Sequence, residues 1–210
     1  MKAIFGRLAV LILLILVIPT SSVTGTALMG TNYGDISYTR TDFGSNPQKE
    51  AYGEGDAFTG LVNLGSKAGM DFRLGVGYHW ADGLYRGQHA ESKIWKAEAD
   101  FLFSLKPGEA VNPYFVMGFS LNYQDVDLVG YSFRDTDWGM KLGFGGEFEL
   151  SPKILARAEL DYLGIEGYDD IRLFGLLGYW FTDRILGRVS AGYEFDSYNA
   201  LWSLGVAFPF

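Results

Sequence analysis

The chain has 210 residues and no cysteine, so we expect a single domain whose fold does not depend on disulfides. Hydrophobic residues make up 48% of the sequence, but 28 glycines and 20% charged residues are interleaved with them. This mixture excludes a bundle of long apolar helices, which would show uncharged runs of roughly 20 residues. A formal net charge of −8 argues against a nucleic-acid partner, which would select a basic surface.

The first 27 residues have the order of a secretory signal peptide: basic, then apolar, then small. The apolar run over residues 8–19 is too short for a comfortable spanning helix, and the small residues that follow it include Gly25 and Ala27. We therefore expect residues 1–27 to be a signal peptide, cleaved near Ala27, and residues 28–210 to form one barrel domain. A retained anchor is the alternative.

Beyond this segment the sequence alternates between apolar and polar residues, which predicts β-strands. Residues 70–80 show the pattern clearly, with Phe72, Leu74 and Val76 on one face and Asp71 and Arg73 on the other. The predicted strands cover residues 31–40, 57–64, 70–80, 94–105, 114–123, 137–150, 154–162, 169–181, 185–195 and 200–210. The strand over 169–181 is the least regular, because Phe174, Leu176 and Trp180 fall on its otherwise polar face.

Ten strands, or eight as the alternative, predict an all-β, closed, antiparallel, up-and-down barrel. An even count returns both chain ends to the same side, which is the periplasmic side in bacterial barrels. The expected periplasmic turns cover residues 65–69, 106–113, 151–153 and 182–184. The expected outer loops cover residues 41–56, 81–92 and 124–135, with two shorter ones over 164–168 and 196–199.

A soluble barrel would also alternate, but with its apolar face inward. Here the polar face is rich in glycine, which suits a narrow lumen, and the strands are long enough to cross a bilayer at a tilt. We therefore expect the bulky face to contact lipid. Aromatic residues expected near the outer strand ends form a girdle: Tyr78, Trp80, Trp95, Tyr123, Trp138, Tyr162 and Trp202. A second group is expected near the periplasmic ends: Phe103, Phe115, Phe148, Phe181 and Phe208.

Charged residues on the polar face would form an ion network in the lumen, because charges removed from bulk water must be paired. Its expected members are Arg73, Lys96, Glu98, Asp100, Lys141, Glu147, Arg157, Glu159, Asp161, Arg172, Arg188 and Glu194. Short turns place Glu147 opposite Arg157, and Arg172 opposite Glu194, on neighbouring strands. We expect this network to fill the lumen, with a conducting pore as the alternative.

The last residues, Ser203-Leu-Gly205-Val-Ala-Phe208-Pro-Phe210, resemble the C-terminal recognition signal of outer-membrane proteins. Residues 112–123 and 155–162 similarly resemble strands of the small OmpA-like and opacity-type outer-membrane barrels. The resemblance implies insertion into a Gram-negative outer membrane by the barrel-assembly machinery, which would recognise Ser203, Gly205, Phe208 and Phe210. Outer-membrane lipid and lipopolysaccharide would surround the barrel. A monomer is favoured, with the oligomeric state left open.

Candidates for catalysis are few. His79 and His89 are the only histidines, and no catalytic motif surrounds either one. Two carboxylate pairs, at Asp125 with Asp127 and at Asp135 with Asp137, lack the spacing of a calcium loop. We expect no catalytic residue, no metal site and no cofactor. The leading hypothesis is a non-enzymatic outer-membrane protein with a structural or surface-interaction role. A narrow small-solute channel is second, and a lipid-modifying enzyme or a protease is a distant third.

Overall fold

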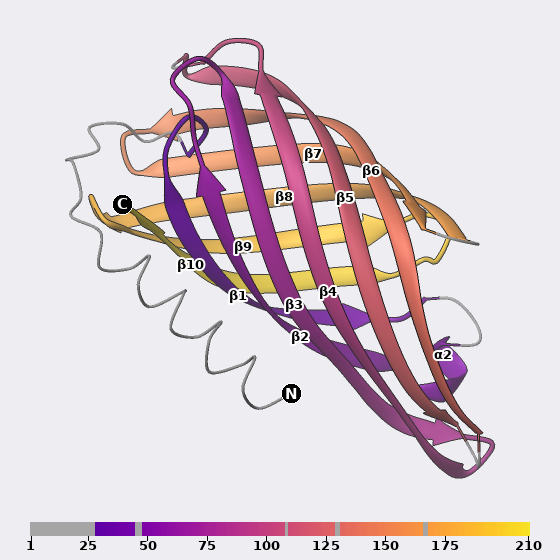
Figure 1. Cartoon of the computed structure of the whole chain (residues 1–210). Coiled ribbons are helices and arrows are strands. Elements are labelled where there is room, and N and C mark those ends of the chain that lie inside the picture. Colours follow the sequence, from indigo (N-terminus) through magenta and orange to yellow (C-terminus); the bar gives the residue numbers. More distant parts are fainter. Residues whose placement is uncertain (1–27, 45–47, 108, 129–130, 166–167) are drawn as a thin grey trace.

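The computed structural model describes residues 28–44, 48–107, 109–128, 131–165 and 168–210, and the proposed signal peptide lies outside them. The strands, with one short helix among them, are β1 Tyr33–Asp42, α2 Gln48–Ala51, β2 Glu54–Leu64, β3 Met70–Tyr85, β4 Gln88–Ser104, β5 Val111–Leu128, β6 Tyr131–Ser151, β7 Ile154–Ile165, β8 Tyr168–Thr182, β9 Ile185–Glu194 and β10 Ala200–Pro209. Each strand pairs with its sequence neighbours, and β1 pairs with β10, so the sheet closes into a barrel (Figure 1). The prediction of a closed ten-stranded antiparallel barrel is confirmed. In the described part of the chain no helix has the length and apolar character needed to span a membrane.

The two ends of the barrel differ. We call the end where β1 begins and β10 ends the terminal end, and the opposite end the hairpin end. Strands β3, β4, β5 and β6 are 16, 17, 18 and 21 residues long, and they extend beyond the other strands at the hairpin end (Figure 1). Here the predicted loops over 81–92 and 124–135 are wrong, because both segments belong mostly to the paired strands of two hairpins. The predicted loop over 41–56 is also shorter than expected, since it holds α2 and the end residues of β1 and β2.

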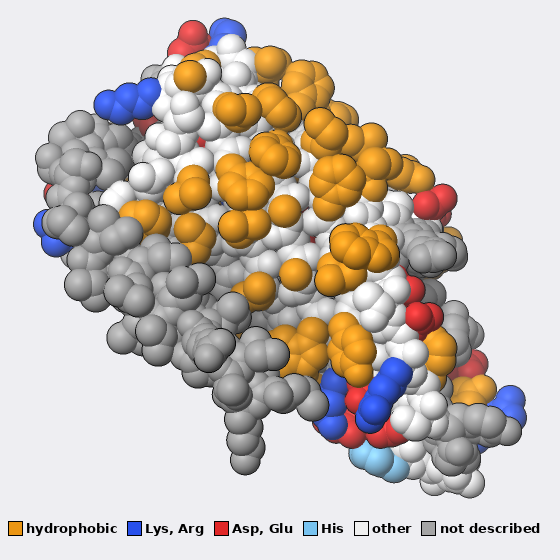
Figure 2. Space-filling view, viewed as in Figure 1, with side chains coloured by type: hydrophobic (Ala, Val, Ile, Leu, Met, Phe, Trp, Pro, Cys, Tyr) orange, Lys and Arg blue, Asp and Glu red, His pale blue; other side chains and the backbone are white. Residues whose placement is uncertain are grey.

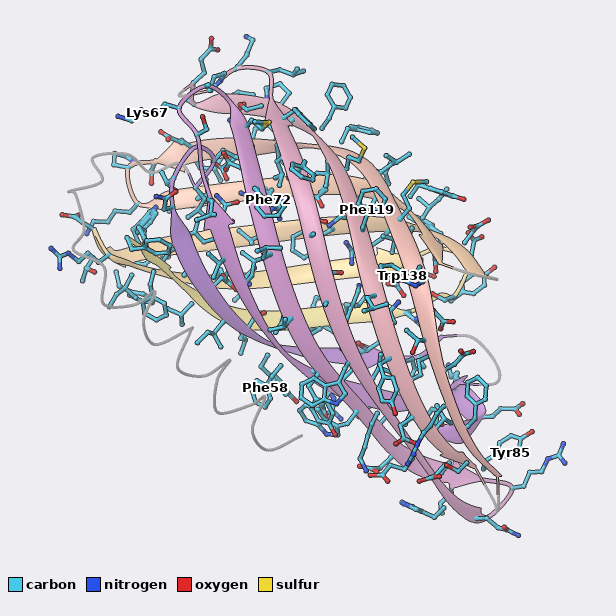
Figure 3. The ribbon with its side chains drawn as sticks, viewed as in Figure 1. Phe58, Lys67, Phe72, Tyr85, Phe119 and Trp138 are labelled. Carbon is cyan, nitrogen blue, oxygen red and sulfur yellow. The ribbon has the colours of Figure 1, made fainter. Side chains whose placement is uncertain are left out.

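The exterior of the barrel is apolar around its middle. Side chains at alternate positions point outward and are exposed there, among them Ile36, Leu74, Phe101, Phe119, Phe144, Leu173 and Leu204. Figure 2 shows apolar side chains spread over one face of the barrel, with charged side chains gathered toward its ends. Figure 3 places Lys67 at the terminal end and Tyr85 at the tip of the hairpin end, with Phe72 and Phe119 between them. A continuous apolar exterior of this size marks a surface that contacts lipid.

The alternation reverses its polarity where β3–β6 project beyond the other strands. Along the projection Lys93 and Arg134 lie on the outward face, in register with Asp125 between them. Ala81, which is buried, and Phe133 lie on the inward face. The sequence still alternates with period two, but polar residues now point outward, as on a sheet that has left the apolar layer for water. This change explains why the segment was predicted as loop.

The lumen has an apolar floor at the terminal end. Two clusters of buried side chains form it, the first made of Leu28, Tyr33, Leu155, Trp180, Leu186 and Ala207 and the second of Met29, Leu102, Tyr114 and Val116. The inward-facing Leu176 and Trp180 that made β8 irregular in sequence lie at this level or just above it, and both are buried. These two residues depart from the polar pattern because, at this level, the inward side chains of the barrel are apolar instead of charged.

Candidate functional site

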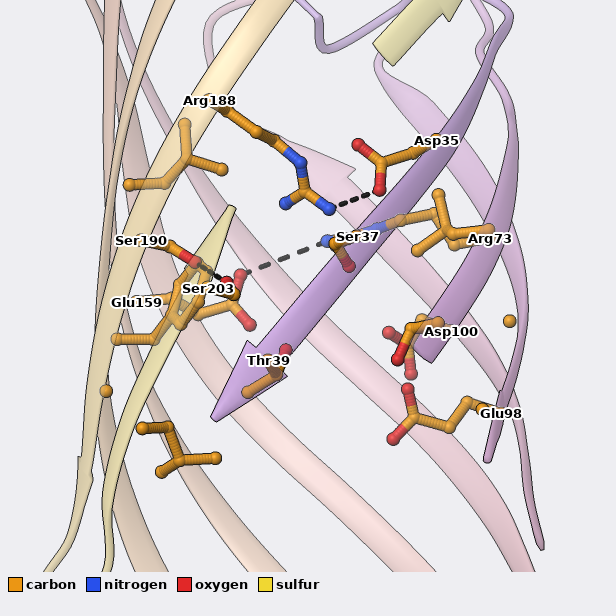
Figure 4. Close-up of a pocket in the computed structure, with 18 of the residues that line it drawn as sticks. Asp35, Ser37, Thr39, Arg73, Glu98, Asp100, Glu159, Arg188, Ser190 and Ser203 are labelled. Atoms are coloured by element: carbon orange, nitrogen blue, oxygen red, sulfur yellow. Dashed lines mark hydrogen bonds and ion pairs between the residues drawn. The ribbon is translucent and has the colours of Figure 1, made fainter. Parts of the chain in front are cut away.

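The lumen above the floor is filled with paired charges. Among the described residues the ion pairs facing it are Arg73–Glu159, Lys96–Glu98, Lys141–Asp100, Arg157–Glu147, Arg172–Asp161 and Arg188–Asp35. Figure 4 shows Arg188 directed at Asp35, and Arg73 directed at Glu159 across the barrel. Most of these groups are deeply buried, so each charge depends on its partner for the stabilisation that bulk water would otherwise supply.

Glycines make room for these charges. In the strand register Gly118 lies opposite Asp100, and Gly143 lies opposite Asp161. A Cβ atom at Gly118 would lie 2.0 Å from Oδ1 of Asp100, and one at Gly143 would lie 2.2 Å from Oδ1 of Asp161. A larger residue at either position would therefore displace the carboxylate. These two glycines therefore leave the volume that a charged neighbour on the next strand occupies.

The two cross-strand pairs predicted from sequence fare differently. Glu147 and Arg157 are direct partners in the register, and Nη2 of Arg157 lies 2.6 Å from Oε2 of Glu147. Arg172 is likewise in register with Glu194, as predicted, but its ion pair is with Asp161 on the other side, at 2.7 Å. Glu194 instead accepts a hydrogen bond of 2.8 Å from Nδ2 of Asn199. An arginine between two carboxylates can face only one of them closely, and the buried one prevails.

Sequence reasoning left three buried carboxylates out of the ion network, although it had placed Asp71 on the polar face of its strand. Asp35 pairs with Arg188 in the lumen. Asp71 accepts hydrogen bonds near the floor, and Asp170 anchors the β9–β10 loop by accepting a hydrogen bond of 2.7 Å from Oγ of Ser197. The inward phase of β3 and β8 would have added Asp71 and Asp170, because each lies two residues from an arginine assigned to the lumen, whereas no inward face was assigned to β1 from the sequence.

A cavity of about 220 Å³ lies among these groups. Its polar lining includes Arg73, Lys96, Glu98 and Glu159, with Phe174 and Leu201 as apolar contributors. Polar cavities of this size normally hold water. The lumen therefore contains a small polar space between its ion pairs.

Residues 28–30, which we call the N-terminal segment, are held at the floor by hydrogen bonds and apolar contacts. The backbone N–H groups of Leu28 and Met29 each donate to Oε1 of Glu147 at 3.0 Å. The N–H of Gly30 donates to Oδ2 of Asp71 at 2.9 Å. The side chains of Leu28 and Met29 enter the two apolar clusters, one each. This segment therefore belongs to the closure of the lumen at the terminal end.

The catalytic candidates do not form a common site. His79 faces inward and lines the cavity, whereas His89 lies near the tip of the β3–β4 hairpin on the outward face. Asp125 forms an ion pair of 3.3 Å with Arg134 on the outward face, and Asp137 accepts a hydrogen bond from Gln124 on the inward face. In the described residues no group of three or more His, Asp or Glu side chains could hold a metal ion.

The seven residues of the predicted girdle point outward. Tyr78 contacts both Trp80 and Trp95, with ring centroids 5.7 Å apart for Tyr78 and Trp80 and 4.5 Å apart for Tyr78 and Trp95. Phe58, which sequence reasoning omitted, extends this cluster at 5.7 Å from Trp80. The remaining members, Tyr123, Trp138, Tyr162 and Trp202, are exposed on the exterior.

The C-terminal strand completes the barrel. Phe208 is in register with Gly34 of β1, and the N–H of Phe210 donates to the carbonyl of Asn32 at 3.0 Å. Ser203 faces the lumen beside Ser190, and the nearby Gly205 lies opposite Arg188. The residues of the predicted assembly signal thus lie on the strand that closes the sheet or, for Phe210, directly after it.

An all-β barrel with an apolar exterior and a charged interior defines a class, the transmembrane β-barrels. The family model of the outer membrane protein beta-barrel domain matches residues 8–183, and the chain belongs to this family. Membership places the chain in the outer membrane of a Gram-negative bacterium. Because bacterial barrels place both chain ends in the periplasm, we expect the terminal end to face the periplasm and the hairpin end to face the exterior.

Several solved structures are similar to this chain at low identity. Neisserial surface protein A is 17% identical, with 85% of this chain and 97% of that chain covered and a TM-score of 0.44. The N-terminal barrel domain of OprF from Pseudomonas aeruginosa is 13% identical, with 87% and 100% covered and a TM-score of 0.41. Ail, the attachment invasion locus protein of Yersinia pestis, is 13% identical, with 87% and 100% covered and a TM-score of 0.42. No curated protein sequence matches the chain.

Proposed function

We propose that this protein is a non-enzymatic outer-membrane barrel whose lumen does not conduct solutes and whose role is structural or lies in contacts at the cell surface. The observation that carries the proposal is the apolar floor, in which Leu28 and Met29 complete two buried clusters across the periplasmic end of the lumen. An ion or sugar crossing this layer would lose its hydration without gaining polar partners.

The ion pairs support the same conclusion. A conducting pore keeps its charged groups hydrated and separated along a water-filled path. Here the charges are bonded to one another, and Arg157 and Glu147 are both nearly inaccessible to solvent. Opening a path would require breaking buried pairs, and each such break costs on the order of 3–5 kcal/mol when one partner is left uncompensated.

The β3–β6 projection supports the surface role. It carries outward-facing ion pairs, and it presents the large apolar side chain of Phe133, 53% exposed, beyond the apolar layer. A narrow channel remains the second candidate, because the cavity of about 220 Å³ lies in the lumen and its lining is charged.

Planar-bilayer recording tests the proposal. Purified barrel should give no discrete openings at concentrations at which a general porin inserts and conducts, and gel mobility should confirm that the sample is folded. Reproducible openings that disappear in a heat-denatured sample would overturn the sealed lumen and establish the channel.

A further inference from the structure

The N-terminal segment holds an unusual arrangement of donors and carboxylates. Glu147 already has a cationic partner in Arg157, yet it also accepts the N–H groups of Leu28 and Met29 at 3.0 Å. Leu28 is 2% exposed and Glu147 is also 2% exposed. The backbone nitrogen of Leu28 is therefore held against a buried carboxylate.

Among the described residues near the floor, one buried carboxylate has no cationic partner. Every cation that faces the lumen has a carboxylate partner within its ion pair. Asp71, which is 1% exposed, has only neutral donors: the N–H groups of Gly30 and Ser66 and the side-chain amide of Asn63. One positive charge at this level would balance the group, because a buried carboxylate without a cation is costly.

The sequence suggests how the backbone nitrogen of Leu28 could carry that positive charge. The small residues Gly25 and Ala27 stand at the third and first positions before Leu28, which is the pattern of a signal-peptide cleavage site. Hydrolysis of the Ala27–Leu28 peptide bond consumes one water molecule and leaves a carboxylate on Ala27 and an ammonium group on Leu28. The cleavage acts on the exported, unfolded chain, before strand pairing buries Leu28.

We propose that signal peptidase cleaves between Ala27 and Leu28, and that the new α-ammonium of Leu28 binds Glu147 as a structural cation of the barrel floor. Cleavage then does more than release the chain. It supplies one positive charge at the level of the floor, in contact with Glu147, and it turns a neutral N–H donor into a charge-assisted one. The closed floor is thus a property of the processed protein.

Two measurements on protein purified from outer membranes test this proposal independently of conductance. N-terminal sequencing and intact mass should give Leu28 as the first residue, and any other first residue overturns it. A short pulse of an amine-acetylating reagent, read by peptide mass spectrometry, should modify the α-amine about tenfold more slowly in the folded barrel than in urea. Equal rates in the two states would also overturn it.

Variants separate the contact from general burial. Glu147→Gln should raise the labelling rate of the α-amine in the folded barrel, whereas Glu149→Gln, a carboxylate at the same end of the same strand, should not change it. If Glu147→Gln fails to fold, inserting Gly-Ser between Ala27 and Leu28 keeps Glu147 and displaces the ammonium by two residues. The α-amine of that variant should be labelled rapidly. Protection that persists in whichever of these variants folds would refute the assignment.

Discussion

At the scale of single residues, the lumen is built from complementary sizes across neighbouring strands. A carboxylate on one strand lies opposite a glycine on the next, as Asp161 does with Gly143 and Asp100 does with Gly118. The pairing explains how a ten-stranded barrel holds so many charges in close contact. It also distinguishes these glycines from Gly175, which faces outward with no atom within 4 Å of an added Cβ.

Gly143→Val should therefore destabilise the barrel. The added side chain occupies the place of Asp161, whose pair with Arg172 must then shift, and overpacking of this kind costs about 1–3 kcal/mol. Gly175→Val on β8 is the matched control and should be neutral or slightly stabilising, since valine favours strands. Urea unfolding in detergent, followed by tryptophan fluorescence, measures both. Equal losses in the two variants would contradict the complementarity argument.

The choice of partner by Arg172 gives a second prediction. Asp161→Asn leaves the guanidinium of Arg172 without its nearest anion in a buried site, so we expect a loss on the order of 3 kcal/mol. Glu194→Gln changes a carboxylate that is in register with Arg172 but bonded to Asn199 and Ser197, and it should cost on the order of 1 kcal/mol. The same unfolding assay compares them. A larger loss of stability in Glu194→Gln than in Asp161→Asn would show that Arg172 pairs with Glu194, as the sequence predicted.

At the scale of elements, the sequence predicted all ten strands, because the alternation that defines them is a direct result of an apolar exterior. It did not predict how far β3–β6 extend, since beyond the apolar layer the same alternation carries the opposite polarity. The β3–β4 connection also escaped notice. Arg86 and Gly87 both have positive φ, 52° and 78°, as a two-residue hairpin turn requires, but arginine is an uncommon residue for that conformation.

The β3–β4 turn should be accessible from outside the cell. An epitope inserted between Arg86 and Gly87 should be labelled by antibody on intact cells, because this turn lies at the tip of the projection. The same epitope between Asp183 and Arg184, in the β8–β9 turn at the terminal end, should be labelled only after the outer membrane is permeabilised. The reversed result would mean that the barrel is oriented the other way.

At the scale of the whole molecule, the sequence predicted the charged residues that line the lumen but not the apolar floor that lies across its terminal end. Inward phase identified most of the charges of the lumen, but not Asp35. The floor depends on Leu28 and Met29, which belong to no strand and carry no periodic signal. Its trace in the sequence is a set of apolar residues at inward positions, such as Val116 and Trp180, whose meaning requires the three-dimensional arrangement of the terminal end.

Closure of the sheet by β10 leads to the last prediction, which concerns how the barrel is assembled. Phe210 directly follows β10, the strand that pairs with β1, and the resemblance of the C-terminal residues to a recognition signal implies a role for Phe210 that other exterior aromatic residues lack. Phe210→Ser should therefore lower the fraction of chain that reaches the folded, heat-modifiable form in the outer membrane. Phe181→Ser is the control, because Phe181 is an outward-facing aromatic at the same end of the barrel, 64% exposed, but lies within the chain. If both substitutions lower the folded fraction equally, the effect belongs to aromatic residues at the membrane interface in general, and Phe210 has no separate part in assembly.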